Sequence, residues 1–303
     1  MPKEGTKQQF GGDWTSEKLE RVRKYLVAYA TIMNALRKQG RGFRFAYIDA
    51  FAGTGYNTPK EIDDEFAPFF EGLHSEESRQ FLEGSAQVAL KVEPQFDQYI
   101  FIERSPARYR ELIQLGDKFP NLKGKLEFKN TEATSYLDEL CLKRNWNNRR
   151  AVLFLDPFGM QVTWKTITAI AKTGAIDLWL LFPLGTGANR LLTRNGVIPN
   201  SWRTRLDATF GATDWFDEFY KQTEQYELLS DLPVIETRKV ANFDAISRYF
   251  LKRLKTVFPH VAKNPLPLLN SSNCPLYLLY FAAGNPGNGG KIAVRIAENI
   301  LKP

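Results

Sequence analysis

A short apolar segment that ends in an acid and runs into two glycines constrains this chain more than any other feature. Phe45 to Ile48 are apolar, Asp49 follows them, and Gly53 and Gly55 come just beyond. Such a short and almost wholly apolar run predicts a strand buried on both faces of a parallel sheet. Glycines allow a tight turn and a close approach of the backbone to a ligand. We therefore predict a nucleotide-like cofactor over the carboxyl end of this first strand.

Strand-like and helix-like segments alternate along the rest of the chain. Further apolar runs predict strands at residues 98–103, 125–130, 150–155, 176–183 and 275–286. Apolar residues at helical spacing predict helices that include residues 19–36, 164–172, 243–257 and 290–301. This alternation predicts a single α/β domain over residues 1–303. We expect a Rossmann-like three-layer sandwich with a mainly parallel sheet.

Two stretches interrupt the alternation. Residues 58–82 contain prolines, a pair of phenylalanines and many acids, and they predict an inserted lid beside the cofactor loop. Residues 185–235 are irregular and rich in Trp and Phe, and they predict an inserted, mostly helical subdomain. Its arginines, which can hold phosphates while aromatic rings stack on bases, are Arg190, Arg194, Arg203 and Arg205. The alternative is a small packed subdomain with a solvated face.

Composition indicates an ordinary globular protein. The chain has 303 residues, of which 43% are apolar and 25% are charged. No apolar run approaches the roughly 20 residues that a membrane-spanning helix needs, and the first residues form no apolar leader. Cys141 and Cys274 lack the spacing of metal ligands. We expect a cytoplasmic protein without a membrane anchor or a metal site.

The charge of the chain is unevenly distributed. Its net charge is +7, but the stretch from Glu61 to Glu77 contains seven acids and neither Lys nor Arg, so the remainder carries about +14. This excess favours a polyanionic partner such as DNA or RNA. A basic surface without such a partner is the alternative.

Polar residues follow the other predicted strands at the points where each strand ends. The run from Arg150 to Leu155 leads directly into Asp156-Pro157-Phe158-Gly159. An acid, a rigid turn and an aromatic residue therefore meet at the carboxyl end of a buried strand, where α/β sheets bind their ligands. The second strand ends in Glu103, and Asn130 and Glu132 follow the third.

The glycine spacing separates two classes of cofactor. A dinucleotide-binding loop has the pattern G-x-G-x-x-G, whereas the third position here is Thr58. The D-x-F-x-G-x-G pattern formed by Asp49, Phe51, Gly53 and Gly55 is typical of class I S-adenosylmethionine-dependent methyltransferases.

Each part of S-adenosylmethionine has a candidate partner. We expect Asp49 to accept hydrogen bonds from the ammonium group of the amino-acid tail and Glu103 to accept from both ribose hydroxyls. Glu132 or Asn130 would hold the adenine amino group. Ser85 is expected to cap a helix whose amino end points at the cofactor.

Motifs spread over nearly the whole chain strengthen this interpretation. They are FGGDWT, YIDAFAGTG, LFLDPFGMQVTW, IDLWLLFPLG with NRLLT, and PLYLLYFA. Together they resemble the three-Cys-motif partner protein family. The resemblance implies a methyltransferase-like fold, a partner protein of the radical S-adenosylmethionine type that contains the three cysteines, and a bacterial or phage-linked setting.

The segment Asp156 to Gly159 resembles the D/N-P-P-Y/F loop of methyltransferases that act on amino groups of bases. That resemblance implies that Asp156 and the Pro157 carbonyl accept hydrogen bonds from the target amine while Phe158 stacks on the base. The segment departs from the pattern, since one proline is missing and the aromatic residue is displaced by one position.

Three functions remain compatible with these residues. The first is a methyltransferase acting on nucleic acid, with the amino group of a base as its favoured target. A catalytically inactive module that binds nucleic acid or the partner protein is the second. The third is a methyltransferase for a small molecule or a protein.

Overall fold

The computed structural model of the chain describes residues 13–52, 84–157, 159–226 and 233–302. The predicted lid, residues 58–82, lies outside the described residues, as do Gly53, Gly55 and Phe158. Within the described ranges, the helices are all too short or too polar to cross a membrane.

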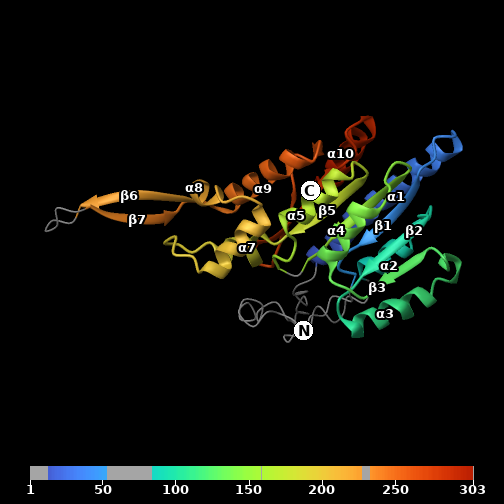
Figure 1. Ribbon diagram of the computed structural model, residues 1–303, viewed down its shortest axis with the longest axis horizontal. Helices are drawn as coiled ribbons and strands as arrows, with labels where there is room; N and C mark the ends of the chain where they lie inside the picture. The colour runs from blue at the N-terminus through green and yellow to red at the C-terminus, as the bar shows by residue number, and fades with distance from the viewer. Residues whose placement is uncertain (1–12, 53–83, 158, 227–232, 303) are drawn as a thin grey trace, which may run out of the picture.

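A large mixed sheet forms the centre of the molecule (Figure 1). Its strands follow the order β3-β2-β1-β4-β5-β10-β8, and β9 also pairs with β10. The strands are β1 (Arg44–Asp49), β2 (Gln98–Ile102), β3 (Leu126–Lys129), β4 (Arg149–Leu155), β5 (Ile176–Phe182), β8 (His260–Val261), β9 (Leu266–Leu269) and β10 (Pro275–Ala283). The strands from β3 to β5 are mutually parallel, whereas β10 runs antiparallel to β5, β8 and β9.

Helices cover both faces of this sheet. One face packs against α1 (Asp13–Lys38), α2 (Ser85–Leu90), α3 (Pro106–Asp117) and α10 (Asn288–Ile300). The other face packs against α4 (Ala133–Lys143), α5 (Trp164–Lys172), α7 (Asn200–Phe210), α8 (Trp215–Phe219) and α9 (Phe243–Val257). The predicted Rossmann-like three-layer sandwich with a mainly parallel sheet is therefore confirmed.

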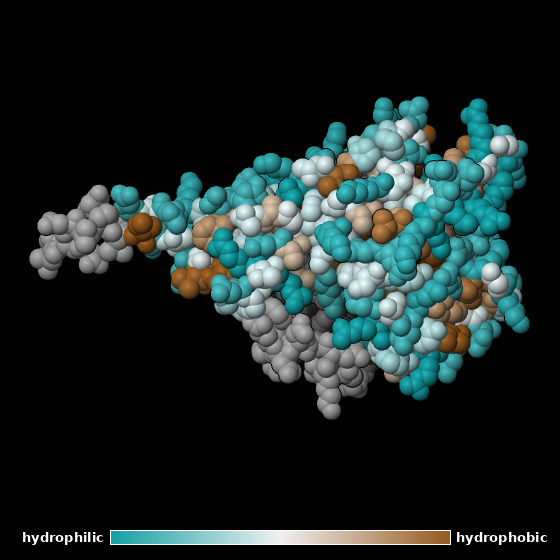
Figure 2. Space-filling view, in the orientation of Figure 1, coloured by the Kyte–Doolittle hydropathy of each residue, from teal (hydrophilic) through white to brown (hydrophobic). Residues whose placement is uncertain are grey.

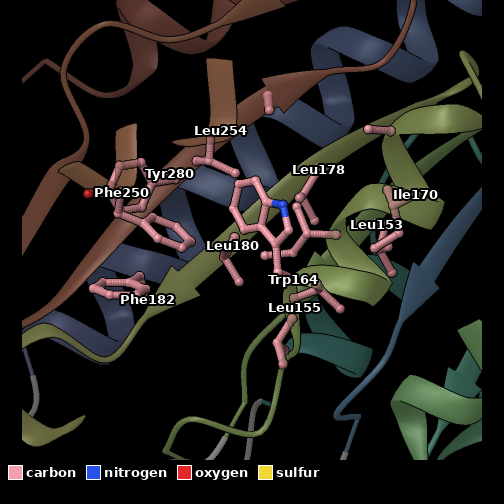
Figure 3. Close-up of a cluster of buried hydrophobic side chains, with 14 of the residues drawn as sticks. Leu153, Leu155, Trp164, Ile170, Leu178, Leu180, Phe182, Phe250, Leu254 and Tyr280 are labelled. Carbon is pink, nitrogen blue, oxygen red and sulfur yellow. The ribbon is translucent and has the colours of Figure 1, made fainter. Parts of the chain in front are cut away.

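The apolar strands predict this architecture because both of their faces are buried. In β1, Phe45 and Tyr47 pack under α1, while Ala46 and Ile48 point to the opposite helical layer. Figure 3 shows the second layer, in which Trp164 lies among apolar side chains of β4 and β5. Successive side chains of a strand point to opposite faces, so a run without polar residues fits only the middle of such a sandwich.

The insertion differs from its prediction. Helices occupy its middle part, but they end at Phe219. A two-stranded antiparallel hairpin follows, consisting of β6 (Tyr220–Tyr226) and β7 (Pro233–Lys239), and it projects from the body (Figure 1). We call this hairpin the β-arm. The prediction of a mostly helical segment is wrong for these strands, because they are not part of the main sheet and so lack its continuous apolar pattern.

Candidate functional site at the carboxyl edge of the sheet

Four adjacent parallel strands end in polar side chains along one edge of the sheet. Asp49 is the last residue of β1, and Glu103, Asn130 and Asp156 directly follow β2, β3 and β4. The strand order places them in the sequence Asn130, Glu103, Asp49, Asp156 along that edge. The carboxyl edge of a parallel sheet is where α/β folds bind ligands. The structure therefore brings together residues that are scattered over more than a hundred positions of the chain.

Asp49 is fully buried beneath this edge. Its Oδ1 accepts a hydrogen bond from the Phe51 backbone N–H at 3.3 Å, and its Oδ2 accepts one from the Tyr47 hydroxyl at 3.2 Å. The pKa of Asp49 is raised to about 7, mainly by burial and also by the nearby charge of Asp156, while hydrogen bonds from Ser85, Phe51 and Tyr47 offset part of the rise. A carboxyl group with this pKa can change its charge near neutral pH.

Backbone hydrogen bonds fix the start of the loop after β1. The Ala50 N–H donates to the Phe154 carbonyl of β4 at 3.1 Å, and the Ala52 N–H donates to the Ile102 carbonyl of β2 at 3.0 Å. The loop thus leaves the sheet held by both neighbouring strands. Phe51, between these two residues, is half-buried.

Ser85 is not the helix cap that we predicted. The cap position of α2 is Gly84, and no side chain caps the helix. Ser85 is instead the first helical residue, and its buried side chain forms a hydrogen bond with Asp49. The prediction is wrong because the Ser85 hydroxyl forms its hydrogen bond with the buried Asp49 carboxylate and not with a backbone N–H group of the first helical turn.

Glu103 and Asn130 form a second part of the edge. Glu103 is 8% exposed, and its Oε1 accepts a hydrogen bond from the Ser105 N–H at 2.6 Å. The Asn130 side-chain amide donates to the carbonyls of Glu103 and Arg104 at 2.8 and 2.9 Å. Asn130 therefore holds the backbone around Glu103 in place through its amide nitrogen. Its side-chain oxygen Oδ1 is an acceptor that can serve another donor.

Glu132 caps α4. Its carboxylate accepts hydrogen bonds from the backbone N–H groups of Thr134 and Ser135 at 3.0 and 2.7 Å and from the Thr134 hydroxyl at 2.7 Å. Burial raises the pKa of Glu132, but these hydrogen bonds outweigh burial and lower it. Both carboxylate oxygens thus have a role in helix capping, and the adenine contact of Glu132 stays a prediction.

The sequence interpretation missed one residue of this site, Lys18. Its side chain from α1 is 6% exposed and its Nζ contacts Asp156 Oδ2. The same Nζ lies 5.3 Å from the ring centre of Trp14 and 5.9 Å from that of Phe154, and Trp14 stacks on Tyr277 at 5.1 Å. The available signal was a lysine four residues from both Trp14 and Val22 on the apolar face of the first helix.

The turn after Asp156 borders the apolar layer of α5 and α9. Pro157 is buried, and Gly159 has a φ of 70°, a backbone conformation that favours glycine. Pro157, Met160 and Phe182 help to line a void of about 10 Å³. Because this volume is close to the minimum for a single water molecule, a base would have to bind outside it.

The four predicted phosphate-binding arginines occupy different environments. Arg190 and Arg194 are exposed, whereas the Arg203 guanidinium lies over the ring of Phe216 at 4.9 Å. Arg205 donates to the Met160 carbonyl at 3.5 Å. The aromatic residues expected to stack on bases include three that are fully packed in the core, namely Phe210, Trp215 and Phe219. These three rings are buried and cannot stack on a ligand. For them the alternative given by the sequence, a small packed subdomain, is correct.

Comparisons with known proteins give only remote likenesses. No protein-family model and no curated protein matches the chain. Among solved structures, protein LPL1258 from Legionella pneumophila is 14% identical, with a TM-score of 0.45, and the match covers 96% of this chain and 92% of that one.

Two further solved structures are similar at still lower identity. A spermidine synthase from Thermotoga maritima is 10% identical over 91% of this chain and 60% of its own, with a TM-score of 0.36. A candidate S-adenosylmethionine-dependent methyltransferase from Listeria monocytogenes is 9% identical over 79% and 91%, with a TM-score of 0.34. Because no TM-score reaches 0.5, we base the fold on the strand order alone.

Proposed function

We propose that this protein is an S-adenosylmethionine-dependent methyltransferase. The observation that supports the proposal is the row of polar side chains at the ends of β3, β2, β1 and β4, with three carboxylates in adjacent positions. A cofactor with an ammonium group, a sulfonium centre and a ribose diol needs acceptors and negative charge, and the edge provides both. The departure from G-x-G-x-x-G agrees with a cofactor that has no pyrophosphate.

The residues present fit such a cofactor. Asp49 is buried, already accepts hydrogen bonds, and would hold the ammonium group in its ionised form. Glu103, at the end of β2, would accept from the ribose hydroxyls, and the carbonyl oxygen of Asn130 would accept from the adenine amine. When bound, S-adenosylmethionine supplies a methyl group on a positively charged sulfur. The protein contributes orientation, since methyl transfer depends mainly on the alignment of the reacting atoms.

As target we propose the amino group of a base in DNA or RNA. Asp156 and the Pro157 carbonyl would accept the two N–H hydrogens of the amine, and Phe158 is assigned the stacking role from the sequence alone. Lys18 contacts only Oδ2 of Asp156, and among the described residues Oδ1 has no hydrogen-bond donor. The Asp156 side chain is 23% exposed, so a ligand can reach this carboxylate.

The ion pair between Lys18 and Asp156 favours a second candidate function. With Lys18 in place, the charge of Asp156 is largely neutralised, as in a site whose purpose is to bind rather than to react. A catalytically inactive module that binds nucleic acid or a partner protein would keep this ion pair permanently. The radical S-adenosylmethionine-like protein implied by the sequence resemblance is the partner that we propose for either function.

Methyl transfer from labelled S-adenosylmethionine to DNA and RNA tests the proposal. We expect Asp156→Ala to lower the transfer rate by about 100-fold or more, because one preorganised acceptor is lost. Asp117→Ala, which removes an exposed acid at the end of α3, is the charge-matched control and should leave the rate unchanged.

Two outcomes would decide against catalysis by Asp156. If the wild-type protein binds the cofactor in calorimetry but methylates no nucleic acid, the inactive module is the better description. If Asp156→Ala transfers methyl groups as fast as the wild type, the catalytic assignment is wrong.

A further inference from the structure

The two faces of the β-arm differ in their surroundings. Side chains alternate between faces along a strand, so Tyr220, Thr237 and Lys239 share one face, which we call the inner face. Lys221 and Arg238 belong to the other, the outer face, because they are paired directly across the hairpin.

The inner face anchors the β-arm to the body. Lys239 Nζ donates to Asn189 Oδ1 at 2.7 Å and to the Leu192 carbonyl at 3.3 Å, and the Tyr220 hydroxyl donates to the Thr193 carbonyl at 2.8 Å. Burial lowers the pKa of Lys239, because removal from water disfavours the charged ammonium group. The arm therefore leaves the body in a fixed direction, as Figure 1 shows.

The outer face places two cations directly opposite each other. Lys221 and Arg238 are both exposed. Within the described chain, neither side chain forms an ion pair, whereas Lys239 on the inner face is enclosed by oxygen atoms. Like charges directly opposite on a hairpin destabilise it. The repulsion within this pair lowers the stability of the arm, and a bound anion would relieve it.

The next pair on the outer face is also polar. Thr223 is paired with Glu236 one step further along the hairpin. Hydroxyl, ammonium and guanidinium groups contact phosphates, and a carboxylate can accept a hydrogen bond from the amino group of a base. The apolar residue Ile235, which is 61% exposed, lies on the inner face instead. Figure 2 shows the arm as a narrow projection with hydrophilic residues along much of its visible side.

The shape of the arm selects among polyanions. A two-stranded ribbon is narrow enough to enter the major groove of B-DNA, which is about 12 Å wide, whereas the major groove of an RNA duplex is too narrow for side chains to read. Strands of 7 residues rise about 3.4 Å per residue and so follow the groove for about 24 Å.

We infer that the outer face of the β-arm binds duplex DNA, with Lys221 and Arg238 contacting phosphates. That the bound duplex is also the substrate rests on the proposed function. Binding of the duplex by the arm needs neither cofactor nor catalysis.

Fluorescence anisotropy with a short labelled DNA duplex and the matching RNA duplex tests the inference on the full chain without cofactor. The double variant Lys221→Gln/Arg238→Gln should bind about tenfold more weakly or worse at low salt. Between about 50 and 200 mM salt, the slope of log affinity against log salt should become shallower by about 1.8, which corresponds to two lost phosphate contacts.

A matched control distinguishes the arm from the general charge of the protein. Lys172→Gln/Lys291→Gln removes two exposed charges at the end of α5 and the start of α10. This control should bind duplexes like the wild type. Thermal unfolding of both double variants should match the wild type, or show the arm variant slightly stabilised because the repulsion between Lys221 and Arg238 is removed.

Several results would overturn the inference. Unchanged affinity and salt slope in the arm variant would do so, and so would an equal loss in both double variants. Competition by polyglutamate as effective as that by the duplex would assign the surface to acidic proteins instead. Binding is measured on the wild type and the arm variant without cofactor, so a protein that methylates no nucleic acid but binds duplexes through the arm would contradict the proposed function and leave this inference intact.

Discussion

Asp49 and Asp177 have similar chemistry at opposite ends of one sheet face. Both are buried against the layer of α1, both accept a hydrogen bond from a tyrosine, and burial raises the pKa of each to about 7. Asp177 is near the start of β5, where its Oδ2 accepts from the Tyr25 hydroxyl at 2.7 Å. Asp49 ends β1 and leads into the cofactor loop.

The difference between them teaches that a perturbed pKa does not by itself identify a ligand site. Asp177 lies among aromatic residues of the core. After burial, the main influence on its pKa is the hydrogen bond from Tyr25, which lowers it. Asp49 interacts with Ser85 and Asp156, two residues of the carboxyl edge. Position in the sheet, more than burial, therefore distinguishes a candidate binding group from a structural one.

The largest expected effect is on cofactor affinity, in which substitutions of Asp49 and Asp177 should differ. Asp49→Asn should weaken S-adenosylmethionine binding by about 100-fold, because a buried acceptor loses the charge that pairs with the ammonium group. Asp177→Asn should leave that affinity unchanged, since Asn still accepts from Tyr25. Isothermal calorimetry measures both, and equal losses in the two variants would show that the comparison is wrong.

A smaller effect is expected on stability. Tyr25→Phe removes the donor to Asp177 and should lower the free energy of unfolding by about 1–3 kcal/mol near pH 8, where Asp177 is ionised. Tyr29→Phe on the same helix is the control, because Asp177 accepts its hydrogen bond from Tyr25. Urea unfolding gives both values, and a cofactor affinity that fell in Tyr25→Phe would connect Asp177 to the site after all.

The smallest expected effect is a pH dependence. The pKa of Asp49 is raised in the folded protein, so the free energy of unfolding contributed by this group is greatest at low pH and falls as the pH rises from about 4 to about 7. Cofactor affinity has the opposite dependence, because only ionised Asp49 pairs with the ammonium group. Affinity for S-adenosylhomocysteine should rise about tenfold from about pH 6 to pH 8. Asp177→Asn should keep this rise and Asp49→Asn should abolish it.

Most of the sheet could be predicted from the sequence. Strands β1, β2, β4 and β5 are short apolar runs because both of their faces are buried, and the runs of β1, β2 and β4 lead to a polar residue at the ligand edge. Asp49, Glu103 and Asp156 were found in this way. The prediction used only local pattern, which is sufficient where burial is uniform along a segment.

The β-arm and Lys18 could not be predicted in this way. Neither strand of the arm belongs to the main sheet, so the uniform burial that reveals a core strand is missing. Lys18 and Asp156 are 138 positions apart, and the sequence does not show which of many lysines meets which acid. Both features depend on tertiary placement, which a local pattern does not contain.

The α1 helix has a consequence for biosynthesis. It contacts Asp156 through Lys18, Asp177 through Tyr25 and Tyr277 through Trp14, and Arg21 donates to the Lys302 carbonyl. Although α1 leaves the ribosome before the sheet does, every one of these partners is translated later. A nascent chain that stops before Tyr277 therefore has every polar residue of the ligand edge, but Trp14 and Arg21 of α1 still lack these partners. The start of α1, which carries Lys18 to Asp156, is thus fixed in full only after β10 and α10 have been made.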